Sequence, residues 1–451
     1  MAQTSNQIKP QNGLFNFLFL AGVALFMGVL MQAPSAQAAT YTVINASDSG
    51  AGSLRQAITD ANANVGADTV NFDGTEGLFQ TGITLSSNLP VITETITIDG
   101  TTAHNFISPN PDVTLRATGL DHCLSISSGA SHVVKGIGCL GATNGIVLSS
   151  SVSGATIGGS ATPDLNYWDN CSGSGIRVNG ADNVTLINNY VGVDVANGTG
   201  ISVINTSTGV VIGGTSGAER NVIVNNTGNG ILLSDSAAII KGNYIGTSTG
   251  SNDLGNGSNG IYIGSGVTST TIGGTDVGTT NVISGNTGNG IYVDGSDGIV
   301  IEKNYIGVSS AGTAALANGA SGILLASGSN TIGGTTSSSI NIISGNTLSG
   351  IRIDGTINNA SSNIIKYNKI GTNALGTAAI ANGGDGILVV TGGTATGLII
   401  GGTDQGNLIS GNTGNGIHIA ATGATGAQIY DNTIGLQADD STALANGANG
   451  I

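Results

Sequence analysis

The chain has 451 residues, of which 76 are glycine, and only 8% of its residues are charged. Its formal net charge of −15 argues against nucleic-acid binding, which requires basic patches. The glycine content leaves no room for the long uninterrupted segments of a helical solenoid. The three cysteines allow at most one bridge and leave one thiol, which excludes a disulfide-built fold.

Residues 1–38 have the features of a signal peptide. Lys9 gives a positive start, residues 14–30 form an apolar stretch, and Ala36-Gln37-Ala38 is a small-residue cleavage site. The stretch is also close to the length that spans a bilayer, so an uncleaved N-terminal anchor is the alternative. The cleavage site favours an exported protein, secreted or associated with the cell surface or outer membrane. No later segment predicts a membrane span in the mature chain.

Residues 39–94 predict an N-terminal cap module of strand, helix and strand. Residues 41–44 and 69–72 have strand composition, and Ser53-Leu54-Arg55-Gln56 between them has capping-box form. Leu54, Ala57, Ile58 and Ala61 share one helical face. A solenoid needs such a lid because its end coil otherwise exposes apolar side chains and free strand edges.

Residues 95–451 predict a solenoid, because one short pattern recurs along them. A Gly-Ile pair is followed by any residue and then by an aliphatic one, as in Ile291-Tyr292-Val293. This alternation predicts a short strand with one buried face, and the Asn or Ser before the glycine allows a corner. The pairs that set the period begin at Gly145, Gly175, Gly200, Gly230, Gly260, Gly290, Gly322, Gly350, Gly386, Gly416 and Gly450.

A longer repeat of about two coils lies over the first and begins at Ile-Gly-Gly, as at Ile272 and Ile332. It predicts about three short strands per coil of roughly 30 residues, with a longer loop in alternate coils, at 309–318 and 373–382. The first isoleucines of successive Gly-Ile strands are expected to stack in one inward ladder: Ile231, Ile261, Ile291, Ile323 and Ile351.

These repeats resemble those of bacterial right-handed parallel β-helix proteins, the pectate-lyase-like superfold. The resemblance rests on residues 282–286, on Gly290-Ile291-Tyr292-Val293 and on Asn304-Tyr305-Ile306-Gly307. Residues 48–58 also resemble the module that opens many exported proteins of this kind. The resemblance implies an all-β, right-handed parallel β-helix. It does not fix an activity, since this group includes lyases, hydrolases, adhesins and structural stalks.

The outward residues of the Gly-Ile strands supply the predicted ligand-binding surface. If the coils are in register, Leu232, Tyr262, Tyr292 and Leu324 form an apolar and aromatic ladder, with Arg352 next in line. We call these five residues the strip. Exposed patches of this composition often bind partners, and stacked aromatic rings suit sugars. The alternative is that the long loops of alternate coils fold over this face.

Asp121, His122 and Cys123, with His132 and Cys139 nearby, are the cluster of metal-capable side chains in the sequence. Thiolate and imidazole bind zinc, but the spacing fits no known finger, and such cysteines are usually ordinary apolar residues. The string Asp121-His122-Cys123 resembles a pectate-lyase segment in which the aspartate helps to bind calcium. Its companion aspartates and arginine motif are missing. We therefore predict no metal site or cofactor beyond loosely bound surface Ca²⁺.

The predicted function is an exported structural or adhesive surface module, without catalytic residues, that presents a repetitive face to a polysaccharide or a cell-surface protein. The alternative is a carbohydrate-active polysaccharide lyase or glycoside hydrolase on the same fold. Hydrolysis needs clustered carboxylates, and Asp439-Asp440 is the only adjacent pair. Residues 446–451 repeat the pattern of 318–323, so we expect the chain to be truncated at its C-terminus.

Overall fold

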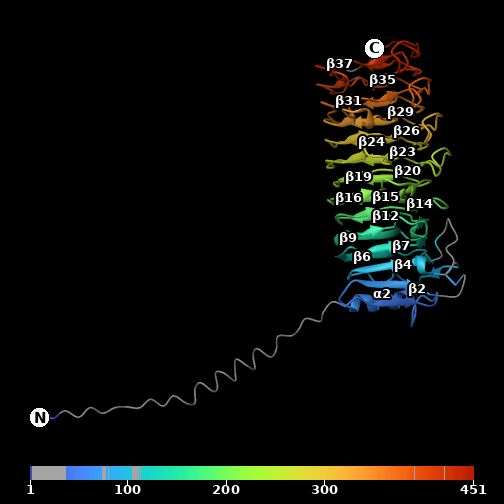
Figure 1. Cartoon of the computed structure of the whole chain (residues 1–451), viewed down its shortest axis with the longest axis vertical. Coiled ribbons are helices and arrows are strands. Elements are labelled where there is room, and N and C mark those ends of the chain that lie inside the picture. Colours follow the sequence, from blue (N-terminus) through green and yellow to red (C-terminus); the bar gives the residue numbers. More distant parts are fainter. Residues whose placement is uncertain are drawn as a thin grey trace.

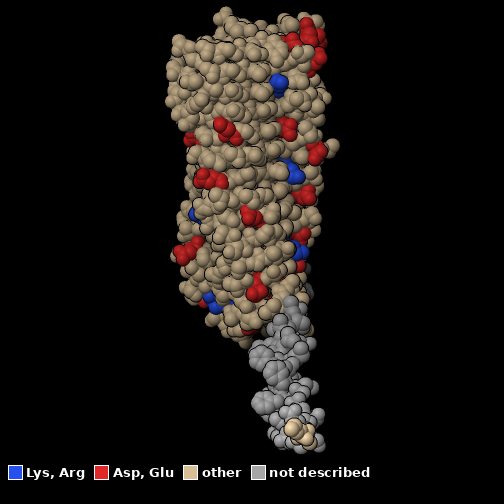
Figure 2. Space-filling view, turned by 90° about the vertical axis from the view of Figure 1, so that its left-hand side faces the viewer, with Lys and Arg blue, Asp and Glu red and all other residues tan. Residues whose placement is uncertain are grey.

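The chain winds into a column of stacked coils (Figure 1). The structure is a computed structural model that describes residues 1–2, 37–73, 78–79, 81–103, 111, 113–390, 392–420 and 422–451. The predicted signal peptide, residues 1–38, lies outside the described residues except at its two ends. No helix among the described residues has the length and apolar character needed to span a bilayer. Charged side chains are sparse on the face of the column shown in Figure 2.

Each complete coil contributes one strand to each of three parallel sheets, which confirms the predicted right-handed parallel β-helix. Sheet A has 14 strands: β1 (Thr40–Val43), β2 (Asp68–Phe72), β4 (Ile96–Asp99), β7 (Val133–Lys135), β10 (Thr156–Ile157), β13 (Thr185–Leu186), β16 (Val210–Ile212), β19 (Ala238–Ile240), β22 (Thr271–Gly273), β25 (Val300–Glu302), β28 (Thr331–Gly333), β31 (Ile364–Lys366), β34 (Ile399–Gly401) and β37 (Gln428–Tyr430).

Sheet B has 13 strands: β3 (Ile83–Thr84), β5 (Val113–Arg116), β8 (Ile137–Leu140), β11 (Asn166–Asp169), β14 (Asn189–Val191), β17 (Val222–Ile223), β20 (Tyr244–Ile245), β23 (Val282–Ile283), β26 (Tyr305–Ile306), β29 (Ile342–Ile343), β32 (Lys369–Ile370), β35 (Leu408–Ile409) and β38 (Thr433–Ile434). Sheet C has 11 strands: β6 (His122–Ala130), β9 (Asn144–Ser153), β12 (Ser174–Asn179), β15 (Thr199–Ile204), β18 (Ile231–Leu233), β21 (Ile261–Ile263), β24 (Ile291–Asp294), β27 (Ile323–Ala326), β30 (Ile351–Ile353), β33 (Ile387–Val389) and β36 (Ile417–Ile419).

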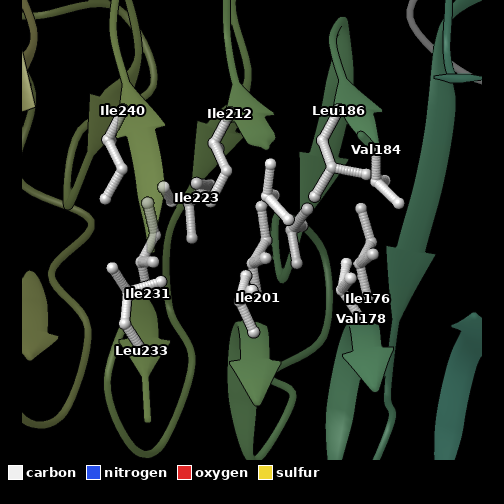
Figure 3. Close-up of a cluster of buried hydrophobic side chains, with 14 of the residues drawn as sticks. Ile176, Val178, Val184, Leu186, Ile201, Ile212, Ile223, Ile231, Leu233 and Ile240 are labelled. Carbon is white, nitrogen blue, oxygen red and sulfur yellow. The ribbon is translucent and has the colours of Figure 1, made fainter. Parts of the chain in front are cut away.

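The core is a continuous filling of aliphatic side chains between the three sheets. Figure 3 shows part of it, where Ile201 and Ile231 of sheet C, Ile212 of sheet A and Ile223 of sheet B point into the same interior. The predicted inward ladder is confirmed, because Ile231, Ile261, Ile291, Ile323 and Ile351 are paired in register and fully buried.

The predicted strand–helix–strand motif is present at the N-terminal end. Strand β1 pairs with β2 in parallel, and helix α2 (Leu54–Ala63) lies between them in the chain. Ser53 is the N-cap, and its side chain accepts a hydrogen bond from the Gln56 backbone N–H. The buried face of α2 joins the hydrophobic core, so the helix covers apolar side chains of the first coil: Leu54, Ala57, Ile58 and Ala61.

Two columns of buried asparagines run along the stack at its corners. In each column the side-chain Nδ2 donates to Oδ1 of the asparagine in the next coil, at 2.8 to 3.2 Å. Leaving one such buried amide unpaired would cost about 1–3 kcal/mol. The first column is Asn166, Asn189, Asn221, Asn243, Asn281, Asn304, Asn341, Asn368, Asn407 and Asn432; the second is Asn197, Asn226, Asn256, Asn286, Asn318, Asn346, Asn382, Asn412 and Asn446.

The long loops of alternate coils pack over sheet B. They follow sheet B strands and stand out beside β20 and β26 (Figure 1). Val308 and Ile380 from two of these loops bury Ile342 of β29 in a small hydrophobic cluster, with Tyr305 at its edge. The loops also bond to one another, since the Ala374 N–H donates to the Gly312 carbonyl at 2.8 Å. The outward face that these loops cover is therefore that of sheet B.

Candidate functional site

The strip lies on the outer face of sheet C and is in register. Leu232 pairs with Tyr262, Tyr262 with Tyr292, Tyr292 with Leu324, and Leu324 with Arg352. All five side chains keep part of their surface in solvent, while the residues on either side of each in the strand are buried. The alternative that the long loops cover this face is wrong, because those loops lie over sheet B.

The two tyrosines of the strip form an edge-to-face pair tied to a carboxylate. Their ring centroids are 5.3 Å apart and the ring planes meet at 77°. The Tyr262 hydroxyl donates to Asp294 Oδ2 at 2.8 Å. Burial and this hydrogen bond raise the pKa of Tyr262 to about 12, and burial followed by the Asp294 charge raises the pKa of Tyr292. Both phenols are therefore protonated at neutral pH, and because the Tyr262 proton is already donated to Asp294, the Tyr262 oxygen is left to accept a hydrogen bond from a ligand.

A second carboxylate and an arginine lie further along the same face. Arg352 Nη2 is 2.8 Å from Asp354 Oδ2. Although burial opposes it, hydrogen bonds from Thr356 and Arg352 lower the pKa of Asp354. In the coil between the two carboxylates, the residue paired with Asp294 is the small Ala326. Asp354 and its bonded arginine therefore lie about two strand spacings, or roughly 10 Å, along the stack from Asp294.

The turn after β30 folds back toward the first carboxylate. Asn358 Nδ2 donates to Asp294 Oδ1 at 2.9 Å, although the two residues are 64 positions apart in the chain. The same turn contacts the neighbouring coil, where the Ser329 N–H donates to the Ser361 carbonyl at 2.8 Å. Asn358 and Tyr262 together fix the Asp294 carboxylate.

This arrangement offers the groups that bind sugars. Tyrosine rings pack against the C–H faces of a sugar ring, and the carboxylate and guanidinium groups exchange hydrogen bonds with its hydroxyls. The positions repeat at about 4.8 Å along a straight face, which suits an extended polymer better than a small molecule. The strip, Asp294, Asp354 and Asn358 together form what we call the sheet C site.

Sequence reasoning found the strip and missed Asp294, Asp354 and Asn358. Strand alternation was a usable signal for Asp294, because it lies two residues after Tyr292 and therefore points outward. No local signal places Asn358 beside Asp294, since the contact crosses two coils.

The metal-capable residues of the first coils do not form one ligand set. Cys123 is bonded to Cys139 inside the core, so its thiol is not free to bind zinc. His132 is buried between the Ile96 N–H, which donates to Nδ1 at 3.3 Å, and the Ser128 carbonyl, 2.9 Å from Nε2. Asp121 exchanges hydrogen bonds with Asn88. Burial lowers the pKa of His122.

In the described part of the chain, no three His, Cys, Asp or Glu side chains are grouped to hold a metal ion.

The adjacent carboxylates Asp439 and Asp440 lie in an exposed turn. Asp439 accepts from Thr442 and from the Ser441 and Thr442 backbone, which lowers its pKa to about 2. Asp440 accepts from the Thr433 hydroxyl at 2.5 Å. Both groups stabilise a turn, and their geometry does not resemble an acid–base pair.

Two further polar regions lie over sheet B. A hollow of about 640 Å³ near the last coils is lined by residues that include Tyr367, Lys369, Asp404 and Asp431. Lys369 Nζ donates to the Ala374 carbonyl at 2.6 Å, and burial lowers the pKa of Lys369. Earlier in the stack, Asp169 is fully buried and its Oδ1 has no hydrogen-bond partner. Burial raises the pKa of Asp169 to about 7.

No protein-family profile matches the chain, and no curated protein sequence matches it. Among solved structures, the A-module of the Azotobacter vinelandii mannuronan C-5 epimerase AlgE4 is 13% identical over 86% of this chain and 97% of its own, with a TM-score of 0.48. The periplasmic alginate epimerase AlgG is 15% identical over 78% of this chain and 76% of its own, with a TM-score of 0.46.

An alginate lyase from Paenibacillus sp. str. FPU-7 is 14% identical over 87% of this chain and 99% of its own, with a TM-score of 0.34. At these identities the likeness concerns the fold. The three structures named here are carbohydrate-processing enzymes, and this finding contradicts the prediction of a non-catalytic structural or adhesive module.

Proposed function

We propose that this is an exported, carbohydrate-active protein that binds a polysaccharide along the outer face of sheet C and acts on it at the sheet C site. The observation that carries the proposal is the uncovered Tyr262–Tyr292 pair, fixed to Asp294 and followed along the strip by Arg352. These groups combine ring faces, a protonated hydroxyl, a carboxylate and a guanidinium within a few coils.

The geometry supports a polymer as the ligand. Each coil adds one strip position, so a chain lying along the stack meets several similar contacts in succession, and weak contacts add up over its length. The edge-to-face packing and the hydrogen bond to Asp294 hold Tyr262 in place before a ligand arrives, which lowers the entropy lost on binding.

Export is supported by two independent features. The sequence predicts a signal peptide at residues 1–38. The disulfide between Cys123 and Cys139 is of the kind that persists in oxidising compartments outside the cytosol.

The test uses the purified chain without its predicted signal peptide and a panel of plant, algal and bacterial polysaccharides. Binding is measured by affinity electrophoresis, new reducing ends report hydrolysis, and absorbance of unsaturated sugars reports elimination. We expect at least one polymer to be bound and cleaved, and the double variant Tyr262→Ser/Tyr292→Ser to lose about tenfold or more in affinity. The control is Tyr305→Phe on sheet B, which should bind as the wild type does. Failure of the wild type to bind or alter any polymer would overturn the proposal.

A further inference from the structure

The basic groups on the outer face of sheet C are largely neutralised by the chain itself. Along the outward positions from β9 to β36, the basic side chains are Arg177, Arg352 and His418. Arg352 is paired with Asp354, whose side chain is only 6% exposed. His418 Nδ1 is 3.1 Å from Asp385 Oδ2. Arg352 and His418, two of these three basic groups, therefore already contact carboxylates of the chain itself.

The carboxylate at the centre of the site has no such compensation. Asp294 accepts hydrogen bonds from the Tyr262 hydroxyl and the Asn358 amide, which are both neutral. The three carboxylates Asp294, Asp354 and Asp385 outnumber the two guanidinium groups Arg177 and Arg352, and the two groups bonded to Asp294 are neutral. The whole chain, at −15, adds to the same sign.

A polyanion is therefore a poor partner for this face. Its carboxylates would meet Asp294 without a free cation beside it, and like charges brought together at an interface cost free energy and slow association. Hydroxyl groups behave in the opposite way, since they donate to carboxylates and accept from tyrosine and guanidinium groups.

We infer that the polysaccharide of the sheet C site is uncharged, in contrast to the alginate named for the structures that this fold resembles. The inference rests on the proposed function and adds the substrate class to it. A neutral sugar without a carboxyl or ester group has no acidified ring proton beside the glycosidic bond, so elimination is not available to it. Cleavage is then hydrolysis, in which water supplies an oxygen to the anomeric carbon and a proton to the leaving oxygen.

The experiment compares one polymer in two charge states, polygalacturonate and the same polymer with its carboxyls methyl-esterified, together with an uncharged glucan and galactan. Affinities are measured at low and at physiological salt. We expect an uncharged polymer to bind about tenfold or more tightly than polygalacturonate, with little dependence on salt. Cleavage products of the glucan or the galactan should carry new reducing ends without unsaturated sugars, and the esterified polymer serves to compare binding, since its ester group would still permit elimination.

Two charge variants locate the effect. Asp294→Asn should reduce the ratio of the affinity for the esterified polymer to the affinity for the charged polymer by about threefold or more. Asp276→Asn removes the same charge from an exposed turn away from sheet C, and it should leave this ratio of affinities unchanged. Tighter, salt-sensitive binding of polygalacturonate that is lost in Arg352→Gln would overturn the inference and leave the proposed function standing. Binding of no polymer at all would overturn both.

Discussion

The outward columns of sheet B and sheet C start from the same sequence pattern and end as different surfaces. On sheet B, Tyr244 and Tyr305 occupy outward positions, as Tyr262 and Tyr292 do on sheet C. The sheet B strands lead into long loops in alternate coils, and those loops pack back over the column. The sheet C strands lead into turns that leave the strip half exposed. Strand alternation thus decides which side chains point outward, and the following loop decides whether they stay open to solvent.

The largest expected effect tests the alternation itself. Ile291 and Tyr292 are neighbours in β24, and the first is fully buried while the second is half exposed. Ile291→Ala should lower the free energy of unfolding by about 2–5 kcal/mol, because it leaves a cavity in the core. Tyr292→Ala should cost less than about 1 kcal/mol. Denaturant titration measures both, and equal losses would contradict the inward and outward assignment.

The second prediction contrasts a buried carboxylate over sheet B with the open one on sheet C. Burial raises the pKa of Asp169 from 3.8 to about 7, so the folded state binds a proton that the unfolded chain has already released. The stability that this group contributes is complete below about pH 4 and is lost as the pH rises through about 7. The loss for the wild type should be on the order of 2–4 kcal/mol.

Asp169→Asn removes this titration. Its stability relative to the wild type should therefore increase steadily between pH 4 and pH 8, as measured by denaturant titration at several pH values. Asp276→Asn, which removes an exposed carboxylate, should show no such trend. A difference between Asp169→Asn and wild type that does not change with pH would show that Asp169 is not protonated in the fold.

The smallest expected effect is a difference in stability and in protease sensitivity between a tyrosine variant on sheet B and one on sheet C. Tyr305 packs at the edge of the cluster formed by Val308, Ile342 and Ile380, so Tyr305→Ala should cost about 1–2 kcal/mol and expose residues 309–318 to protease. Tyr262→Ala should cost less than about 1 kcal/mol and leave cleavage at 309–318 unchanged. Limited proteolysis with mass spectrometry gives the comparison, and equal cleavage in both variants would mean that Tyr305 does not hold the loop.

Much of the fold could be predicted because each coil repeats the last. The Gly-Ile strands, the inward isoleucine ladder and the capped helix at Ser53 all follow from local spacing. The face that the loops cover did not follow, since periodicity separates inside from outside without distinguishing one outward face from another. A signal was nevertheless present: Tyr305-Ile306-Gly307, a sheet B strand and its corner, runs directly into residues 309–318.

The rest of the site depends on contacts between coils. The Asn358–Asp294 bond joins residues separated by two coils, and the sequence carries no mark of it. Similarly, the pairing of Cys123 with Cys139 depends on both positions facing the interior from different sheets, β6 and β8. The prediction of a non-catalytic module rested on the absence of clustered carboxylates in the sequence, and such an absence does not exclude a site assembled across the stack.

The asparagine columns give the molecule a direction and a unit of length. Along each column, Nδ2 of one asparagine donates to Oδ1 of the asparagine in the next coil, so the amide–amide bonds between coils all run in the same direction. A coil inserted or removed as a whole leaves each donor facing an acceptor, whereas a partial coil breaks both columns at once. The length of the stack therefore changes in steps of about 4.8 Å, one inter-strand spacing for each coil. Adding or removing whole coils would lengthen or shorten the face available to a polymer, while the cross-section of each coil stays the same.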